Sequence, residues 1–229
     1  MREFFIANGQ IIAVVIAGLE ALLTLILMFD FIFTRRVFVL LMTLLALGLT
    51  YDAAVMAFGA WIPAEQLPLL SRIRFVSHGL LVPLNIALCG YVLRWNDRKL
   101  LKLWFVTLLL CMAGAASGFA RVLELREFAG MVRYVAGEAT PVWADKINRV
   151  LSFGTVLPLI AAGAVVIKRE KNAGIFLGGL LMFVFAALGP ATGNADLIFL
   201  ISMIGELLML LFFLVYARKE NGRVEKWDT

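Results

Sequence analysis

Seven long apolar runs limit the folds open to this chain more than any other feature of the sequence. Each run reaches the roughly 20 residues that an α-helix needs to cross a bilayer. Backbone amide and carbonyl groups cannot be left without hydrogen bonds in hydrocarbon, so each run must be helical. We therefore predict an all-α, polytopic integral membrane protein, with one seven-helix transmembrane domain over residues 1–229. The predicted spans lie near residues 6–33, 37–62, 74–94, 101–120, 149–167, 173–193 and 196–217, with an outer loop at 121–148.

The composition supports the same class of protein. The chain is 62% hydrophobic and only 16% charged, with a mean hydropathy of +0.95. A soluble domain of this size could not bury that much apolar surface, whereas a bilayer solvates it. We therefore expect a multi-pass protein of the cell membrane, with the lipid bilayer as its partner. The net charge of +5 requires no nucleic acid, because basic residues at the cytoplasmic ends of helices account for it.

The positions of the basic residues predict the orientation of the chain. Of the 21 Lys and Arg residues, 13 follow the first, third, fifth and seventh predicted spans. Short loops that are rich in Lys and Arg face the cytoplasm, so the N-terminus is predicted outside and the C-terminus inside. The 13 residues are Arg35, Arg36, Arg94, Arg98, Lys99, Lys102, Lys168, Arg169, Lys171, Arg218, Lys219, Arg223 and Lys226.

Two of the predicted spans resemble each other. Residues 74–94 and 149–169 are identical at 7 of 21 positions without a gap, at a separation of 75 residues. Two helices that obey the same membrane rules share some Leu, Ala and flanking Arg, but Ser, Gly and Pro in one register favour a duplicated helix. The identical pairs are Arg74/Arg149, Ser77/Ser152, Gly79/Gly154, Pro83/Pro158, Leu84/Leu159, Ala87/Ala162 and Arg94/Arg169.

A stripe of polar side chains follows the third predicted span. Arg74, His78 and Asn85 share one helical face, and Asn85 lies about 16 Å deeper than Arg74 at 1.5 Å per residue. Polar and ionisable groups inside a membrane usually face the bundle interior and mark a functional site. The simpler interpretations are an interfacial anchor for Arg74, a hydrogen-bonded bundle histidine for His78 and an interhelical contact for Asn85.

Acidic residues also lie inside predicted spans. At mid-bilayer, Glu20, Asp52 and Glu206 each require a cationic partner, a proton or a ligand. The inner halves of the spans are nearly all aliphatic, so we expect a cavity that opens outward. No Cys/His cluster predicts a metal site, and no catalytic residue is assigned. The candidates for ligand binding or proton transfer are Asp52, Arg74, His78, Asn85, Arg121, Glu206 and Glu20.

The long outer connection carries charges of alternating sign. Residues 137–141 are typical of a turn, and Pro141 suits the start of the fifth helix. The connection is either a solvated cap held by surface ion pairs or a lid over an outer pocket.

Two stretches carry a family resemblance. Arg35 and Arg36 open the second predicted span, and in the third span Arg74 is followed after eight residues by Pro83 and an aliphatic run. With seven spans and an outside N-terminus, these features resemble the microbial rhodopsins, over about a quarter of the chain.

The departures from that family decide what the resemblance implies. Its retinal is attached to a lysine of helix seven, but residues 195–217 contain no lysine. Ser77 stands where the carboxylate counter-ion is expected, and His78 where an aromatic wall of the retinal pocket is usual. The tryptophans of the sixth helix are missing from 173–193. The resemblance therefore implies a relative without covalent retinal, for which light-driven pumping is not expected.

Two functions from different classes remain open. The first is binding of a small molecule, lipid or ion in an outward-facing polar pocket, for transport or sensing. The cytoplasmic loops are too short for a signalling domain, so sensing would require an oligomer or a signalling partner. The alternative is an intramembrane enzyme that acts on a lipid or isoprenoid with His78 and Asp52 as the acid/base pair.

Overall fold

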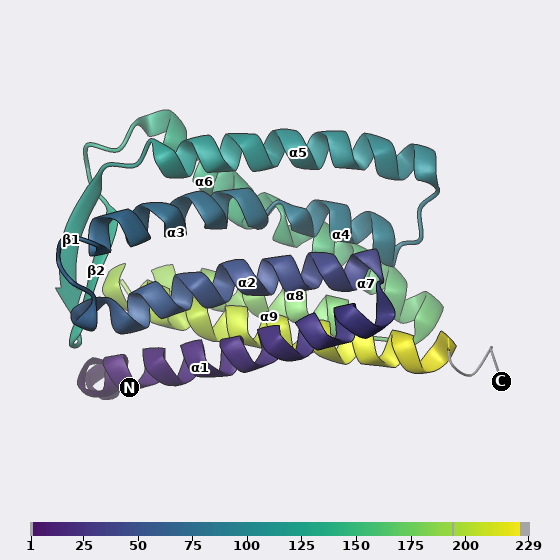
Figure 1. The fold of residues 1–229 in the computed structure, drawn as a ribbon, viewed down its shortest axis with the longest axis horizontal. Helices are drawn as coiled ribbons and strands as arrows, with labels where there is room; N and C mark the ends of the chain where they lie inside the picture. Colours follow the sequence, from purple (N-terminus) through teal and green to yellow (C-terminus); the bar gives the residue numbers. More distant parts are fainter. Residues whose placement is uncertain (1, 194, 225–229) are drawn as a thin grey trace.

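The computed structural model describes residues 2–193 and 195–224 and is mostly helical (Figure 1). Among these residues, six helical segments are long and apolar enough to cross a membrane, and α8 is a shorter apolar helix. The membrane class is therefore supported by length and composition. The elements are α1 (Arg2–Thr34), α2 (Val37–Phe58), the 3-10 turn η1 (Gly59–Trp61), α3 (Leu67–Leu81), α4 (Leu84–Val92), α5 (Asp97–Phe119), β1 (Leu123–Phe128), β2 (Met131–Ala136), α6 (Val142–Gly154), α7 (Val156–Glu170), α8 (Gly174–Ala191) and α9 (Ala195–Val224).

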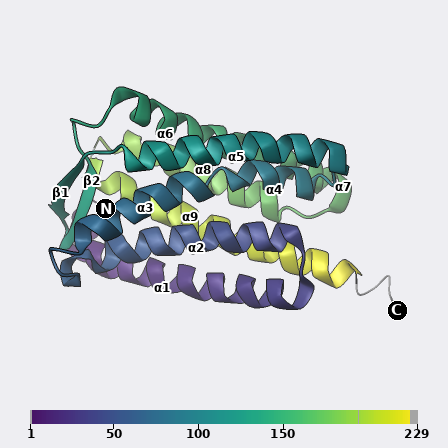
Figure 2. The same ribbon diagram turned by 45° about the horizontal axis from the view of Figure 1, so that its top comes forward.

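The helices lie side by side in one bundle with two distinct ends (Figures 1 and 2). The hairpin end carries β1, β2 and the start of α1. The opposite end carries the α1–α2, α4–α5 and α7–α8 connections and the last turns of α9 (Figure 1). The short basic connections therefore collect at one end, as the orientation argument requires.

Several predicted boundaries are wrong in the same direction. The third predicted span begins at Leu67 rather than near residue 74, and the fifth begins at Val142 rather than near 149. In both cases the helix begins seven residues earlier, in a segment where apolar residues are mixed with polar and charged ones. The helix α9 likewise continues past residue 217 through its charged last turns.

Prolines divide the two similar spans. The ring of Pro83 ends α3 at Leu81, and α4 starts at Leu84. Pro158 lies four residues after Gly154, where α6 ends. A proline ring clashes with the carbonyl group of the residue four positions earlier, and this clash ends α6. Both halves of the predicted duplication are thus broken near the middle of the span. A proline breaks a helix whatever its origin, so the duplication stays a hypothesis.

The all-α prediction missed a β-hairpin in the outer connection. The strands β1 and β2 pair antiparallel from Leu123 opposite Ala136 to Phe128 opposite Met131. Ala129 and Gly130 form the turn with φ of 52° and 80°, the positive values that a two-residue hairpin turn of type I′ needs. The alternating charges of residues 123–128 lie along one strand of this hairpin, so the outer connection has regular structure of its own.

Close backbone contacts join α3 to α5, and a large apolar core fills the bundle away from the hairpin. A Cβ atom on Gly79 of α3 would overlap the Gly114 carbonyl group of α5, and one on Gly114 would overlap that of Gly79. These two helices therefore cross with their backbones in contact. The larger core cluster contains Leu27, Leu45, Leu88 and Phe213 and fills the half of the bundle near the opposite end.

Candidate functional site

A cavity of about 340 Å³ lies beside the hairpin, and we call it the outer cavity. Its walls come from α2, α3, β2, α6 and α9, together with Arg121, two residues after the end of α5. Most of the predicted site residues meet here although they are far apart in the sequence. Its polar and aromatic lining residues are Asp52, Arg74, Phe75, His78, Arg121, Arg133, Asn148, Ser152, Phe199, Ser202 and Glu206.

An ion-paired cluster forms one wall of the outer cavity. The Oδ1 atom of Asp52 lies 3.2 Å from Nε of Arg74, and its Oδ2 atom lies 3.5 Å from Nδ1 of His78. The Arg74 side chain is 5% exposed and that of Asp52 is 14% exposed. Arg74 also donates a hydrogen bond of 2.9 Å to the Tyr134 carbonyl oxygen of β2. The stripe predicted on the third span thus meets the predicted acid of the second span, and the hairpin holds both in place.

Aromatic rings support the arginines of the cavity. The guanidinium carbons of Arg74 and Arg121 lie 4.3 and 4.5 Å from the ring centroid of Phe75. That of Arg133 lies 3.7 Å from the Phe199 ring centroid. Guanidinium groups on aromatic faces keep their hydrogen-bonding edges available for a further partner.

Arg121 lies at the edge of the outer cavity, with its guanidinium group over the Phe75 ring. The residue is 9% exposed, and its buried Nε atom has no hydrogen-bond partner within the described part of the chain. Its backbone carbonyl accepts a hydrogen bond from Arg72, which holds the segment after α5 in position. Burial and the positive charge of Arg74 lower the pKa of the Arg121 guanidinium. An anion in the cavity would offset both effects.

A second, more apolar cavity of about 190 Å³ lies deeper in the bundle, and we call it the inner cavity. Asn85 of α4 lines it, in agreement with the depth expected from the helical rise. Four polar residues line both cavities and therefore separate them: His78, Ser152, Ser202 and Glu206. The remaining lining of the inner cavity is apolar: Leu45, Leu49, Val82, Phe153, Val156, Met182, Ala186 and Met209.

Two predicted acids have different surroundings. Glu206 is 5% exposed, lies at the boundary between the cavities, and its Oε2 atom has no hydrogen-bond partner among residues 2–193 and 195–224. Glu20 is fully buried and lines neither cavity, and the described residues offer no hydrogen bond to either carboxyl oxygen. Its carboxyl group still lies close enough to Glu206 and Asp52 for their charges to interact. Glu20 therefore lies behind the cavity wall.

The hairpin supplies site residues that were not among the candidates. Arg133 is 7% exposed and lines the outer cavity, and Tyr134 holds Arg74 through its carbonyl group. The available signal was the β-branched and aromatic content of residues 131–136, which favours a strand. Of the two interpretations of the outer connection, contact with the cavity favours the lid.

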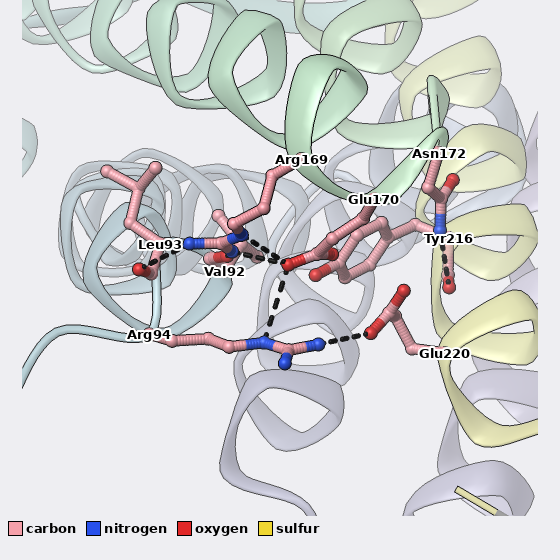
Figure 3. A network of polar contacts seen from close by, with 8 residues as sticks. All are labelled: Val92, Leu93, Arg94, Arg169, Glu170, Asn172, Tyr216 and Glu220. Atoms are coloured by element: carbon pink, nitrogen blue, oxygen red, sulfur yellow. Dashed lines mark hydrogen bonds and ion pairs between the residues drawn. The ribbon is translucent and has the colours of Figure 1, made fainter. Parts of the chain in front are cut away.

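A second polar cluster lies at the opposite end of the bundle (Figure 3). Arg94 lies 3.4 Å from Glu170 and 3.1 Å from Glu220, both of which are almost fully buried. Arg169 bonds to Glu170 and donates hydrogen bonds of 2.6 and 2.9 Å to the carbonyl groups of Val92 and Leu93. The cluster joins the ends of α4, α7 and α9. Glu170 and Glu220 lie just beyond the predicted ends of the fifth and seventh spans, so the prediction of nearly all-aliphatic inner halves is not tested by this cluster.

Comparison of the chain with protein-family models and with curated protein sequences finds no match. The resemblance to the microbial rhodopsins accordingly stays a prediction. Within the described residues, no group of three or more His, Cys, Asp or Glu side chains is placed to hold a metal ion. The site is therefore interpreted from its own geometry.

Proposed function

We propose that the chain crosses the membrane seven times, with the hairpin end outside and the C-terminus in the cytoplasm. The seventh span is α8, whose 18 residues extend about 27 Å at 1.5 Å per residue, close to the thickness of a hydrocarbon core. The collection of basic connections at the end opposite the hairpin supports the orientation.

Single cysteines test this orientation. Glu127→Cys places a thiol on the hairpin, and Lys99→Cys places one in the first turn of α5 at the opposite end. A membrane-impermeant maleimide applied to intact cells should label the first and not the second. Labelling of the second alone would reverse the orientation.

We further propose that the protein binds a small molecule with an anionic group in the outer cavity, for transport or sensing. The observation that carries this proposal is the largely buried guanidinium group of Arg121, which lines the cavity and makes no ion pair or side-chain hydrogen bond with the described residues. Arg74 and Arg133 line the same space, and Asp52 is the ion-pair partner of Arg74. A carboxylate or phosphate group satisfies the planar donor edge of arginine with charge-assisted hydrogen bonds.

Each neighbouring group has a distinct role in this proposal. Asp52 holds Arg74 in its orientation, and Phe75 forms the surface on which Arg74 and Arg121 rest. Glu206 lies at the inner boundary of the cavity, where its carboxyl group can carry a proton as the anion arrives or leaves. These roles require no metal or cofactor.

Anion binding to the purified protein tests the proposal. Native mass spectrometry first identifies any molecule that co-purifies, and titration calorimetry in lipid nanodiscs then uses benzoate and phenyl phosphate as probes. Arg121→Gln should weaken binding of the better probe by about tenfold or more, since hydrogen bonds to charged groups contribute about 1.5–3 kcal/mol. The control is Arg126→Gln, which changes an exposed arginine of β1 that does not line the cavity. Equal affinities for the two variants would refute the proposal.

A second candidate function rests on the pair of His78 and Asp52. A carboxylate 3.5 Å from Nδ1 can orient an imidazole for general acid/base catalysis inside the cavity. This geometry would suit an intramembrane enzyme that acts on a lipid or isoprenoid. The test is turnover of membrane lipids and isoprenoid alcohols by the purified protein, with products identified by mass spectrometry. Product formation that His78→Ala abolishes would favour the enzyme, and unchanged turnover in that variant would exclude His78 as the catalyst.

A further inference from the structure

We propose that the ligand is a compact amphiphile, with its anionic group in the outer cavity and an apolar group of about the size of a benzene ring in the inner cavity. This inference rests on the proposed anion-binding function and adds the chemical class of the ligand. It is carried by the contact between a polar and an apolar cavity of defined volumes.

The two cavities adjoin, and the polarity of the lining changes where they meet. His78, Ser152, Ser202 and Glu206 line both cavities, and the proposed ligand occupies both along a path between these side chains. The arginines all lie on the outer side of this boundary. Beyond it, apart from Asn85, the inner cavity is lined by aliphatic, aromatic and methionine side chains. Such a lining favours an apolar group because burial removes its surface from water.

The volume of the inner cavity limits the size of that group. An apolar cavity of about 150 Å³ holds a benzene molecule, and the inner cavity measures about 190 Å³. A ring or a short branched chain fits this space, whereas the long acyl chains of a phospholipid do not. Leu45, Leu49 and Met209, which line the inner cavity, belong to the packed core that fills the rest of the bundle, so the path ends there.

The four shared residues give the boundary a selective role. Their hydroxyl, imidazole and carboxyl groups can contact the polar part of a ligand while its apolar group lies deeper. A ligand of this class satisfies the arginines and the apolar lining together. A small inorganic anion would leave the inner cavity unfilled.

A series of carboxylic acids of increasing apolar size tests the inference. Acetate, butyrate, hexanoate, benzoate, octanoate and decanoate are titrated into the protein in lipid nanodiscs, with empty nanodiscs as the blank. Affinity should rise about fourfold for each added methylene group, as expected for burial of a methylene. The rise should stop once the inner cavity is full, near the size of hexanoate and benzoate.

Variants of α8 locate the effect. Ala186→Phe fills the inner cavity, and it should abolish the dependence on apolar size while acetate binds as before. The control is Ala187→Phe, because Ala187 is exposed on the surface of the bundle and lines neither cavity. Met182→Ala enlarges the inner cavity and should move the limit toward longer chains, which provides a second test if the larger side chain prevents folding.

The outcomes separate this inference from the proposed function. If acids of all sizes bind equally well, the anion site is real and the amphiphile inference is wrong. If none of the acids binds, the proposed function itself fails. If affinity rises with size but Ala186→Phe and Ala187→Phe behave alike, the apolar group lies elsewhere and the inference is overturned.

Discussion

Removing one member of the ion pair between Asp52 and Arg74 should destabilise the folded protein by about 3 kcal/mol. The two side chains are 14% and 5% exposed, and their charged atoms are 3.2 Å apart. Breaking a buried pair leaves an uncompensated charge, which typically costs about 3–5 kcal/mol. We expect the lower end of that range, because Asp52 keeps His78 as a partner and both residues line a cavity.

A double-mutant cycle isolates the interaction from other contacts of the same residues. Arg74→Gln also loses the hydrogen bond to the Tyr134 carbonyl group, and that loss cancels in the cycle. The single variants are Asp52→Asn and Arg74→Gln, and the double variant combines them. We expect the double variant to be more stable than the sum of the single effects by about 2 kcal/mol.

The chain offers a matched surface pair as the control. Arg149 and Asp145 of α6 are 3.0 Å apart, but their side chains are 76% and 43% exposed. Exposed pairs four residues apart on a helix contribute only about 0.3–0.5 kcal/mol, so the cycle of Asp145→Asn and Arg149→Gln should give a small coupling.

The free energy of unfolding is measured by titration with sodium dodecyl sulfate in mixed micelles, followed by tryptophan fluorescence. A coupling below about 1 kcal/mol for Asp52 and Arg74, equal to that of the surface pair, would refute the reasoning. Desolvation of the two charges would then balance their attraction, and the pair would have no stabilising role.

Three further predictions concern other parts of the bundle. Gly79→Leu should prevent folding, because its side chain would overlap the α5 backbone. Gly18→Leu should fold normally, because a Cβ atom there meets no other atom within 4 Å. Equal yields of the two folded variants by size-exclusion chromatography would contradict this. Glu20 should react with dicyclohexylcarbodiimide, because a buried carboxyl group with no hydrogen bond from the described residues stays neutral. Peptide mass spectrometry should find the label, and its absence from folded protein would show that Glu20 is charged or shielded. Arg169→Gln should lower the free energy of unfolding by about 2 kcal/mol, because it loses hydrogen bonds between α7 and the end of α4. Lys168→Gln, which changes an exposed neighbour, should have little effect. An equal change in both variants would show that the cluster in Figure 3 does not stabilise the fold.

The helices and much of the candidate site could be predicted from the sequence, because both depend on local periodicity. An apolar run of sufficient length must be helical in a bilayer, and the spacing of Arg74 and His78 places them on one face of whichever helix they form. The acid Asp52 stood out because an ionisable group inside a span requires a partner. These are properties of single segments, and tertiary contacts do not change them.

The tertiary structure decided which faces meet. The spacing of residues along one helix does not say which neighbouring helix that face contacts. The sequence pattern therefore does not predict that Arg133 lines the outer cavity, nor that Glu20 lies outside it. The ion pairs of Arg94 with Glu170 and Glu220 join residues up to 126 positions apart, and only the packing of α4, α7 and α9 brings them together. Local composition therefore determined that the chain forms apolar helices with polar stripes. Long-range packing determined that the stripes enclose a polar cavity above an apolar one, because cavities form only between elements.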